Sequence, residues 1–412
     1  MPDIESASEI ANPVAYPRLS QQKPPGTKRL RIAVPMVSRD PEDGHRAATS
    51  LELFFDLVVV VAVAFAADDL HGDLVRGEVA GPVLGYLVVF FGIWWAWMNF
   101  TWFASAYDSG DVVYRVFVLV TMTVALMLAA GVPAFLDDLD RGTAVLGYVV
   151  MRLALVTQWV RAGRADPPRR TTAYRYAIGV AVCQIGWSVT IAFPALWWPT
   201  LAVLAPIELL VPMWAESASP TTWHPGHIVE RYGLFMIIVL GESVLAASLA
   251  IQSATSGNEL SGELIQIIIG GLLIIYSIWW IYFDRPQDRL LTSTRTVFIW
   301  RYTHLLVFAS VAAVGAGLAV AIDRAAGRSE LGEFATGAAI AVPVAVFLLS
   351  LWALYVRAAD QSMRRFGVPM AATAILAASF TGFPVLLVGL LLSVLVVVKE
   401  ISRLRIDPEA PA

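Results

Sequence analysis

The stretch LELFFDLVVVVAVAFAADD, residues 51–69, is apolar except for Glu52, Asp56 and its two final aspartates. As an α-helix it would extend about 28 Å at 1.5 Å per residue, close to the roughly 30 Å hydrocarbon thickness of a bilayer. We therefore predict an all-α, polytopic membrane protein with about twelve transmembrane helices. Residues 368–402 could instead form one long helix kinked at Pro384, which would leave eleven. The other predicted helices lie near 82–104, 112–134, 144–162, 175–193, 196–215, 228–252, 263–283, 298–321, 334–357, 368–382 and 384–402.

The composition of the 412-residue chain leads to the same class. Hydrophobic residues make up 58% and charged residues 15%, against roughly 45–50% and about 25% in soluble domains. So much apolar surface does not fit inside a soluble core, which excludes an ordinary soluble enzyme. A net charge of −4 gives no basic excess for nucleic acid. The lipid bilayer is the expected partner, no cofactor motif is present, and the oligomeric state is not determined.

The chain divides into a tail, a helical domain and a short end. Residues 1–50 hold seven of the 23 prolines and no apolar run, which predicts a disordered tail. The helical transmembrane domain would cover 51–404, and 405–412 would be a second short tail. With the N-terminus inside, the inner segments collect 21 Lys and Arg residues and the outer loops only four. Because cytoplasmic loops carry this excess, both termini are predicted to be cytoplasmic.

The two halves of the domain, 51–215 and 228–404, show a weak internal repeat. Glu52 and Glu230 open the first helix of each half at an offset of 178 residues, and Arg115 and Arg301 open the third at an offset of 186. Six helices per half would make the repeats parallel. Chance similarity among apolar segments is the alternative.

Nine ionisable residues lie inside the predicted helices. At about 3 kcal/mol each at mid-bilayer, exposing all nine to lipid would cost roughly 27 kcal/mol. We therefore expect most of them to face the interior and to pair as a charge cluster along a translocation route. The nine are Glu52, Asp56, Arg115, Arg152, Glu208, Glu230, Arg231, Glu242 and Arg301.

Several of these charges have a simpler interpretation. Thr49-x-x-Glu52 matches a capping box, so Glu52 could only close the first turn of its helix. The arginines could be structural clamps rather than ligand-binding residues. Five acids face four arginines, which leaves one acid unpaired. Glu242, the only one in the outer half of its helix, is the candidate.

Histidines and tryptophans provide further candidates. His224, His227 and Glu230 form H-x-x-H-x-x-E, in which His227 and Glu230 are weak metal-ligand candidates, so that no metal site is predicted. His304 could relay protons or be a structural, hydrogen-bonded histidine. The stretch WWAWMNFTW, residues 94–102, is typical of an interfacial aromatic belt, and a substrate-stacking platform is the alternative.

Three motifs together resemble the bacterial low-temperature requirement A family over about residues 50–400. They are LELFFDL at 51–57, the Trp94-Trp95-x-Trp97 cluster, and HIVERYGLF with LGES between 227 and 243. The resemblance implies a multi-pass protein of the bacterial cytoplasmic membrane, connected with growth in the cold, and supplies no substrate or reaction. The motif residues it implies are Glu52, Asp56, His227, Glu230, Arg231, Gly241 and Glu242.

Three functions remain open from the sequence. A secondary transporter or an ion or proton pathway for an unknown small solute or ion would use the intramembrane carboxylates and arginines. A non-catalytic stress, cold-adaptation or sensor component would need only a partner. A membrane-embedded lipid-modifying enzyme would use the carboxylates as acids and bases, but no nucleophile-base pattern or aspartate-rich motif supports it.

Topology is directly testable. Reporter fusions at residues 168 and 290 should both be cytoplasmic, because the segments around them carry the Lys and Arg excess. One fusion found on the outside would overturn the predicted orientation.

Overall fold

The computed structural model describes residues 31–39, 46–136, 141–255, 261–285, 287–356 and 362–406. This part of the chain forms twelve α-helices and no β-strand, which confirms the all-α prediction. The helices are α1 Ser50–Val75, α2 Ala80–Tyr107, α3 Val112–Leu136, α4 Arg141–Ala165, α5 Arg170–Ala192, α6 Trp197–Glu216, α7 Pro225–Thr255, α8 Gly262–Phe283, α9 Thr294–Ala325, α10 Glu333–Val356, α11 Ser362–Ala377 and α12 Pro384–Ile406.

Ten of the twelve helices are long and apolar enough to cross a membrane, so the chain is a multi-pass membrane protein. The other two are α5 and α11. Helix α5 is 23 residues long but more polar, with Arg170 and Arg175 in its first two turns and Gln184 in its middle. Helix α11 has only 16 residues.

The region 368–402 forms two helices rather than one kinked helix. A short 3₁₀ turn, Ala378–Phe380, ends the first of them, and Pro384 is the first residue of α12. Proline has no N–H to donate and disfavours a helical conformation in the residue before it, so it starts a helix here.

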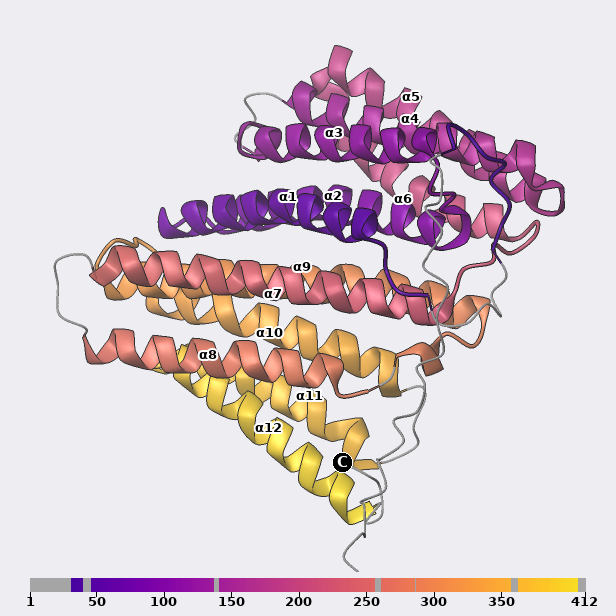
Figure 1. Cartoon of the computed structure of the whole chain (residues 1–412). Coiled ribbons are helices and arrows are strands. Elements are labelled where there is room, and N and C mark those ends of the chain that lie inside the picture. Colours follow the sequence, from indigo (N-terminus) through magenta and orange to yellow (C-terminus); the bar gives the residue numbers. More distant parts are fainter. Residues whose placement is uncertain are drawn as a thin grey trace, which may run out of the picture.

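The helices run back and forth and form two groups, α1–α6 and α7–α12, hereafter the first and second halves (Figure 1). Helix α1 packs against both α7 and α9 and is the main contact between the halves. Helix α9 is the most buried of these ten helices. In its most apolar stretch of 18 residues, 83% of the residues are buried inside the bundle, against 22% in the corresponding stretches of α6 and α12.

Several helix pairings recur in the two halves. In the first half α1 packs on α3, α3 on α4, and α4 on α5; in the second α7 packs on α9, α9 on α10, and α10 on α11. The extensive contact of α8 with α12 has no equally close counterpart between α2 and α6. The shared order is what a duplicated six-helix unit would give, and the repeat itself stays a prediction.

Part of the predicted tail is ordered. Residues 31–39 lie extended at the α2–α3 connection, where Val34 N–H donates to the Asp111 carboxylate at 2.9 Å. The Arg31 carbonyl accepts from Val112 N–H at 3.1 Å, and Met36 is only 1% exposed. Backbone contacts of this kind produce no apolar periodicity, so they could not be predicted from the sequence. Residues 1–30, 40–45 and 407–412 lie outside the described parts of the chain.

Glycines allow α8 and α12 to approach closely. A Cβ placed on Gly270 would lie 2.6 Å from the backbone of Leu386, and one on Gly389 would lie 2.6 Å from the Gly270 carbonyl oxygen. Neither contact can be relieved by rotating a side chain, because both involve backbone atoms.

We expect Gly270→Ala to lower the free energy of unfolding by about 1–3 kcal/mol, because the added methyl forces the two backbones apart. Gly92→Ala is the matched control, since a Cβ at Gly92 meets no atom within 4 Å. Thermal unfolding in detergent measures both. Equal midpoints for the two variants would contradict the close packing of α8 on α12.

Candidate functional site

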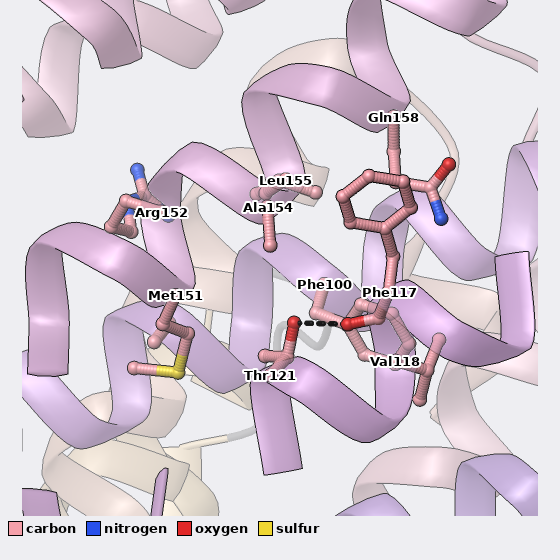
Figure 2. Close-up of a pocket in the computed structure, with 10 residues that line it drawn as sticks. Phe100, Phe117, Val118, Thr121, Met151, Arg152, Ala154, Leu155 and Gln158 are labelled. Atoms are coloured by element: carbon pink, nitrogen blue, oxygen red, sulfur yellow. Dashed lines mark hydrogen bonds between the residues drawn. The ribbon is translucent and has the colours of Figure 1, made fainter. Parts of the chain in front are cut away.

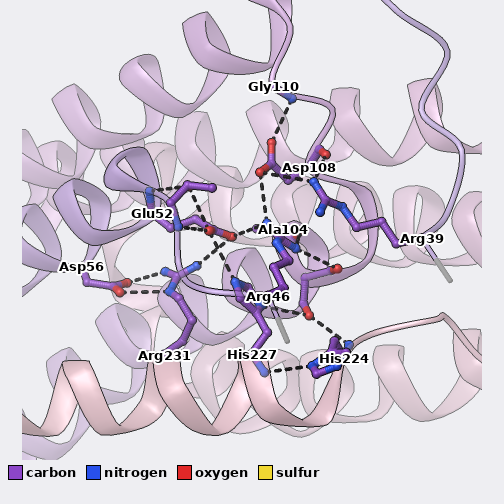
Figure 3. Close-up of polar contacts among 12 residues, drawn as sticks. Arg39, Arg46, Glu52, Asp56, Ala104, Asp108, Gly110, His224, His227 and Arg231 are labelled. Carbon is purple, nitrogen blue, oxygen red and sulfur yellow. Dashed lines mark hydrogen bonds and ion pairs between the residues drawn. The ribbon is translucent and has the colours of Figure 1, made fainter. Parts of the chain in front are cut away.

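A bidentate ion pair joins the two halves inside the bundle. Arg231 on α7 donates from Nε to Asp56 Oδ2 at 2.9 Å and from Nη2 to Oδ1 (Figure 3). Both side chains are completely buried. Trp97 on α2 donates its indole N–H to Asp56 Oδ1 at 2.7 Å. The Asp56 carboxylate therefore has donors for both oxygens, as a buried charge requires.

Glu52 lies one turn before Asp56 and makes a second contact with α7. Its Oε2 lies 3.4 Å from His227 Nε2, and its Oε1 lies 3.4 Å from Arg231 Nη1. Residues 52 and 227, like 56 and 231, are 175 positions apart. Two pairs spaced by four residues therefore face each other in register along two helices that start on the same side of the bundle.

Glu52 also completes the predicted capping box. Thr49 N–H donates to Glu52 Oε2 at 2.8 Å, and Glu52 N–H donates to Thr49 Oγ1 at 3.3 Å. The Glu52 carboxylate thus both caps its own helix and contacts α7, so the two interpretations of Glu52 do not exclude each other.

The N-terminal segment supplies a cation that the sequence analysis missed. Arg46 lies 3.1 Å from Glu52 Oε1 and 3.0 Å from Asp108 Oδ2, and it donates to the carbonyls of Ala104 and Ser105 at the end of α2 (Figure 3). Burial lowers the pKa of Arg46 from its ordinary value. Burial also raises the pKa of Asp108, and the nearby Glu52 carboxylate acts in the same direction. Arg46 was assigned to the tail because no helical pattern surrounds it.

Aromatic rings pack beside this charge network inside the bundle. Trp94, Trp95 and Trp97 are at most 1% exposed, so the predicted interfacial belt is wrong for these three residues. The Trp97 ring stacks on Phe235 with centroids 4.2 Å apart. The sequence WWAWMNFTW is rich in aromatic side chains on every face of a helix, so it did not show which of them face lipid and which face the interior.

His304 is a buried histidine in the same aromatic layer. Its Nδ1 donates to the Trp300 carbonyl one turn earlier at 2.7 Å, and its ring lies edge-on to Tyr232 with centroids 5.0 Å apart. Its Nε2 has no hydrogen-bond partner among the described residues. These contacts favour the structural interpretation and leave one nitrogen able to accept a proton.

A second buried charge pair lies wholly within the first half. The Glu208 carboxylate accepts from Tyr148 Oη at 2.5 Å, Gln184 Nε2 at 3.0 Å and Trp187 Nε1 at 3.1 Å, and Arg152 Nη2 lies 3.9 Å away. Three neutral donors thus stabilise Glu208. Sequence reasoning found the two charges but not these donors, which come from separate turns of α4 and α5.

Arg152 adjoins a cavity of about 10 Å³ between α2, α3 and α4 (Figure 2). That volume accommodates about one water molecule. Arg152 Nε and Nη1, and Gln158 Nε2, have no hydrogen-bond partner within the described part of the chain. This region is therefore polar but too small for a solute.

The remaining predicted residues do not join either pair. Arg115 is exposed and donates from Nε to the Gly110 carbonyl at 3.1 Å. Glu242 is half-buried and forms no ion pair with any described residue. Glu230 is half-buried, and its Oε2 has no hydrogen-bond partner in the described chain. Arg301 is buried among aromatic rings at the start of α9.

In the parts of the chain that the structure describes, no three His, Cys, Asp or Glu side chains converge on a possible metal site. His227 Nδ1 lies 3.1 Å from Ser105 Oγ, and its Nε2 faces Glu52. Both ring nitrogens are thus engaged by protein groups.

Replacing one member of the Asp56–Arg231 pair should destabilise the protein far more than replacing both. We expect Asp56→Leu or Arg231→Met to lower the free energy of unfolding by about 3–5 kcal/mol, because each leaves an opposite charge buried. The double variant should recover most of this loss. The free energies of unfolding of the wild type, the two single variants and the double variant can be measured in mixed micelles as a double-mutant cycle. Arg115→Met, which removes an exposed arginine, is the control. A double variant as unstable as the sum of the singles would contradict the pairing.

Comparison with known proteins identifies the family of this chain. The family model of the bacterial low temperature requirement A protein (LtrA) matches residues 47–400, which include every residue of the α1–α7 network except Arg46. An uncharacterised protein of Rhizobium meliloti (strain 1021) is 26% identical over 281 residues, covering 63% of this chain and 66%, just under two thirds, of that protein. No solved structure matches the chain. With a family match over most of its length, the chain belongs to the bacterial low temperature requirement A family.

Proposed function

We propose that this protein is a secondary transporter or ion pathway of the bacterial cytoplasmic membrane, with both termini in the cytoplasm. The observation that carries the proposal is the fully buried Asp56–Arg231 pair between α1 of one half and α7 of the other. A bundle that only had to be stable could replace such a pair by apolar side chains at little cost. Ionisable residues kept inside a membrane domain are typical of ion and substrate pathways.

The contacts at the two ends of α1 support a mechanism. At one end Glu52 and Asp56 hold α7, and at the other His71 Nε2 lies 2.7 Å from Asp323 on α9. These groups lie about 28 Å apart along α1. Each contact joins the two halves and contains a group that can gain a proton. Protonation of the carboxylate at one end, Asp56 or Asp323, would remove its negative charge and weaken that contact, while the other end stays closed, as alternating access requires.

Two further features fit this proposal. A cavity of about 500 Å³ lies between the halves near the α1–α7 contact, with Trp102 and Glu216 from the first half and Val297 and Phe298 from the second. Glu242 is a half-buried carboxyl farther along α7, without an ion pair in the described chain. It would serve as the protonatable site toward the outer side.

Flux through reconstituted vesicles tests the proposal. Wild-type protein should dissipate an imposed pH gradient, alone or with one member of a solute panel, faster than protein-free vesicles. Glu242→Gln should reduce this rate at least tenfold because it removes the outer proton site. Glu263→Gln, an exposed acid at the start of α8, is the matched control and should leave the rate unchanged.

The apolar double variant Asp56→Leu/Arg231→Met separates function from stability. We expect it to be folded and inactive, because no proton can then open the contact between α1 and α7. Undiminished flux in this variant or in Glu242→Gln would remove those residues from the mechanism. Wild-type vesicles that move neither protons nor any solute would overturn the transport proposal.

A further inference from the structure

The cavity of about 500 Å³ contains a buried cation that the proposed mechanism does not use. Arg301 lines this cavity and is only 3% exposed. Its guanidinium carbon lies 5.0 Å from the centre of the Trp102 ring and 4.6 Å from that of Phe298, and both rings line the same cavity. The Tyr302 ring is 5.1 Å away, so the charge lies among three aromatic rings at the cavity wall.

Arg301 has no anionic partner within the described residues. Its Nε makes no hydrogen bond there, and no carboxylate forms an ion pair with it. Glu216 is the acid lining the cavity, but Tyr176 Oη, Thr221 Oγ1 and Thr221 N–H donate to its oxygens at 2.8–2.9 Å. A buried guanidinium that makes no direct ion pair is costly, so an anion entering the cavity would gain a strong partner.

Other groups add positive potential. Thr292, Ser293 and Thr294 line the cavity at the start of α9, whose first-turn N–H groups carry the positive end of the helix dipole. Arg169 also lines it, and Asp166 Oδ2 lies 3.7 Å from Arg169 Nη1. Arg301 lies near the Glu216 carboxylate but forms no ion pair with a carboxylate among the described residues, whereas Arg169 has Asp166.

We propose that this cavity binds an organic phosphate, with its phosphate on Arg301 and the first turn of α9 and its apolar part against Trp102 and Phe298. The volume lies within the roughly 300–1,000 Å³ range of small-molecule sites. A guanidinium and a helix N-terminus are both suited to phosphate oxygens. A soluble organic phosphate and the headgroup of a phospholipid share this chemistry. Identifying the ligand as the transported solute rests on the proposed function, whereas binding does not.

Two probes distinguish these sources. Phenyl phosphate, titrated calorimetrically into detergent-purified protein, represents the soluble ligand. Phosphatidylglycerol, measured by native mass spectrometry against phosphatidylcholine, represents the lipid. We expect saturable binding of at least one probe, weakened at least tenfold by Arg301→Gln. Arg295→Gln removes an exposed arginine of the same helix end that does not line the cavity, and should bind as wild type does.

A second variant leaves the buried charge in place. Thr292 is exposed at the cavity mouth, so Thr292→Trp should obstruct entry and weaken binding similarly without changing the unfolding midpoint. If Arg301→Gln does not fold, Thr292→Trp alone tests whether the probes bind in this cavity. Absence of binding by both probes, or binding unchanged in the folded variants, would overturn the proposal. Flux plays no part in these measurements, so a protein that binds phenyl phosphate but transports nothing would refute the proposed function alone.

Discussion

The contact of Asp56 with Arg231 constrains the rest of the structure more than any other interaction. Both charges are completely buried, and each is tolerable only because the other lies beside it. The pair fixes the rotation of α1 and α7 about their axes and their relative height. The neighbouring contact between Glu52 and His227, one turn away on both helices, follows from the same register. The interface between the halves is thus specified by charge as well as by apolar packing.

The other buried charges are stabilised in different ways. The Glu208 carboxylate is stabilised by three neutral donors with Arg152 at 3.9 Å, and it belongs to one half only. Arg301 is surrounded by aromatic rings and faces a cavity whose lining acid, Glu216, accepts hydrogen bonds from Tyr176 and Thr221 instead. The Arg152 charge has the Glu208 carboxylate within ion-pair distance, while Arg301 forms no ion pair with a carboxylate in the described chain. This difference is why Arg301, rather than Arg152, indicates a ligand.

The proposed transport mechanism and the proposed phosphate site share one region of the molecule. The cavity lies between the halves and reaches Pro225 at the start of α7, the helix that Glu52 and Asp56 contact. Movement of α1 against α7 would therefore change the walls of the cavity. A ligand held by Arg301 would favour the arrangement in which it binds best, since a ligand shifts an equilibrium through its differential affinity for the two states.

The sequence by itself determined the membrane class, the approximate position of each helix and six of the buried charges, namely Glu52, Asp56, Arg152, Glu208, Arg231 and Arg301. These follow from the length of apolar stretches and from the cost of a charge in hydrocarbon, which are local properties of the chain. Only the tertiary structure decided that Arg231 pairs with Asp56, that Arg46 joins them, and that Trp97 faces inward. Partners 175 residues apart depend on helix rotation and register, and a helix that is apolar on every face carries no periodic signal of which side is buried.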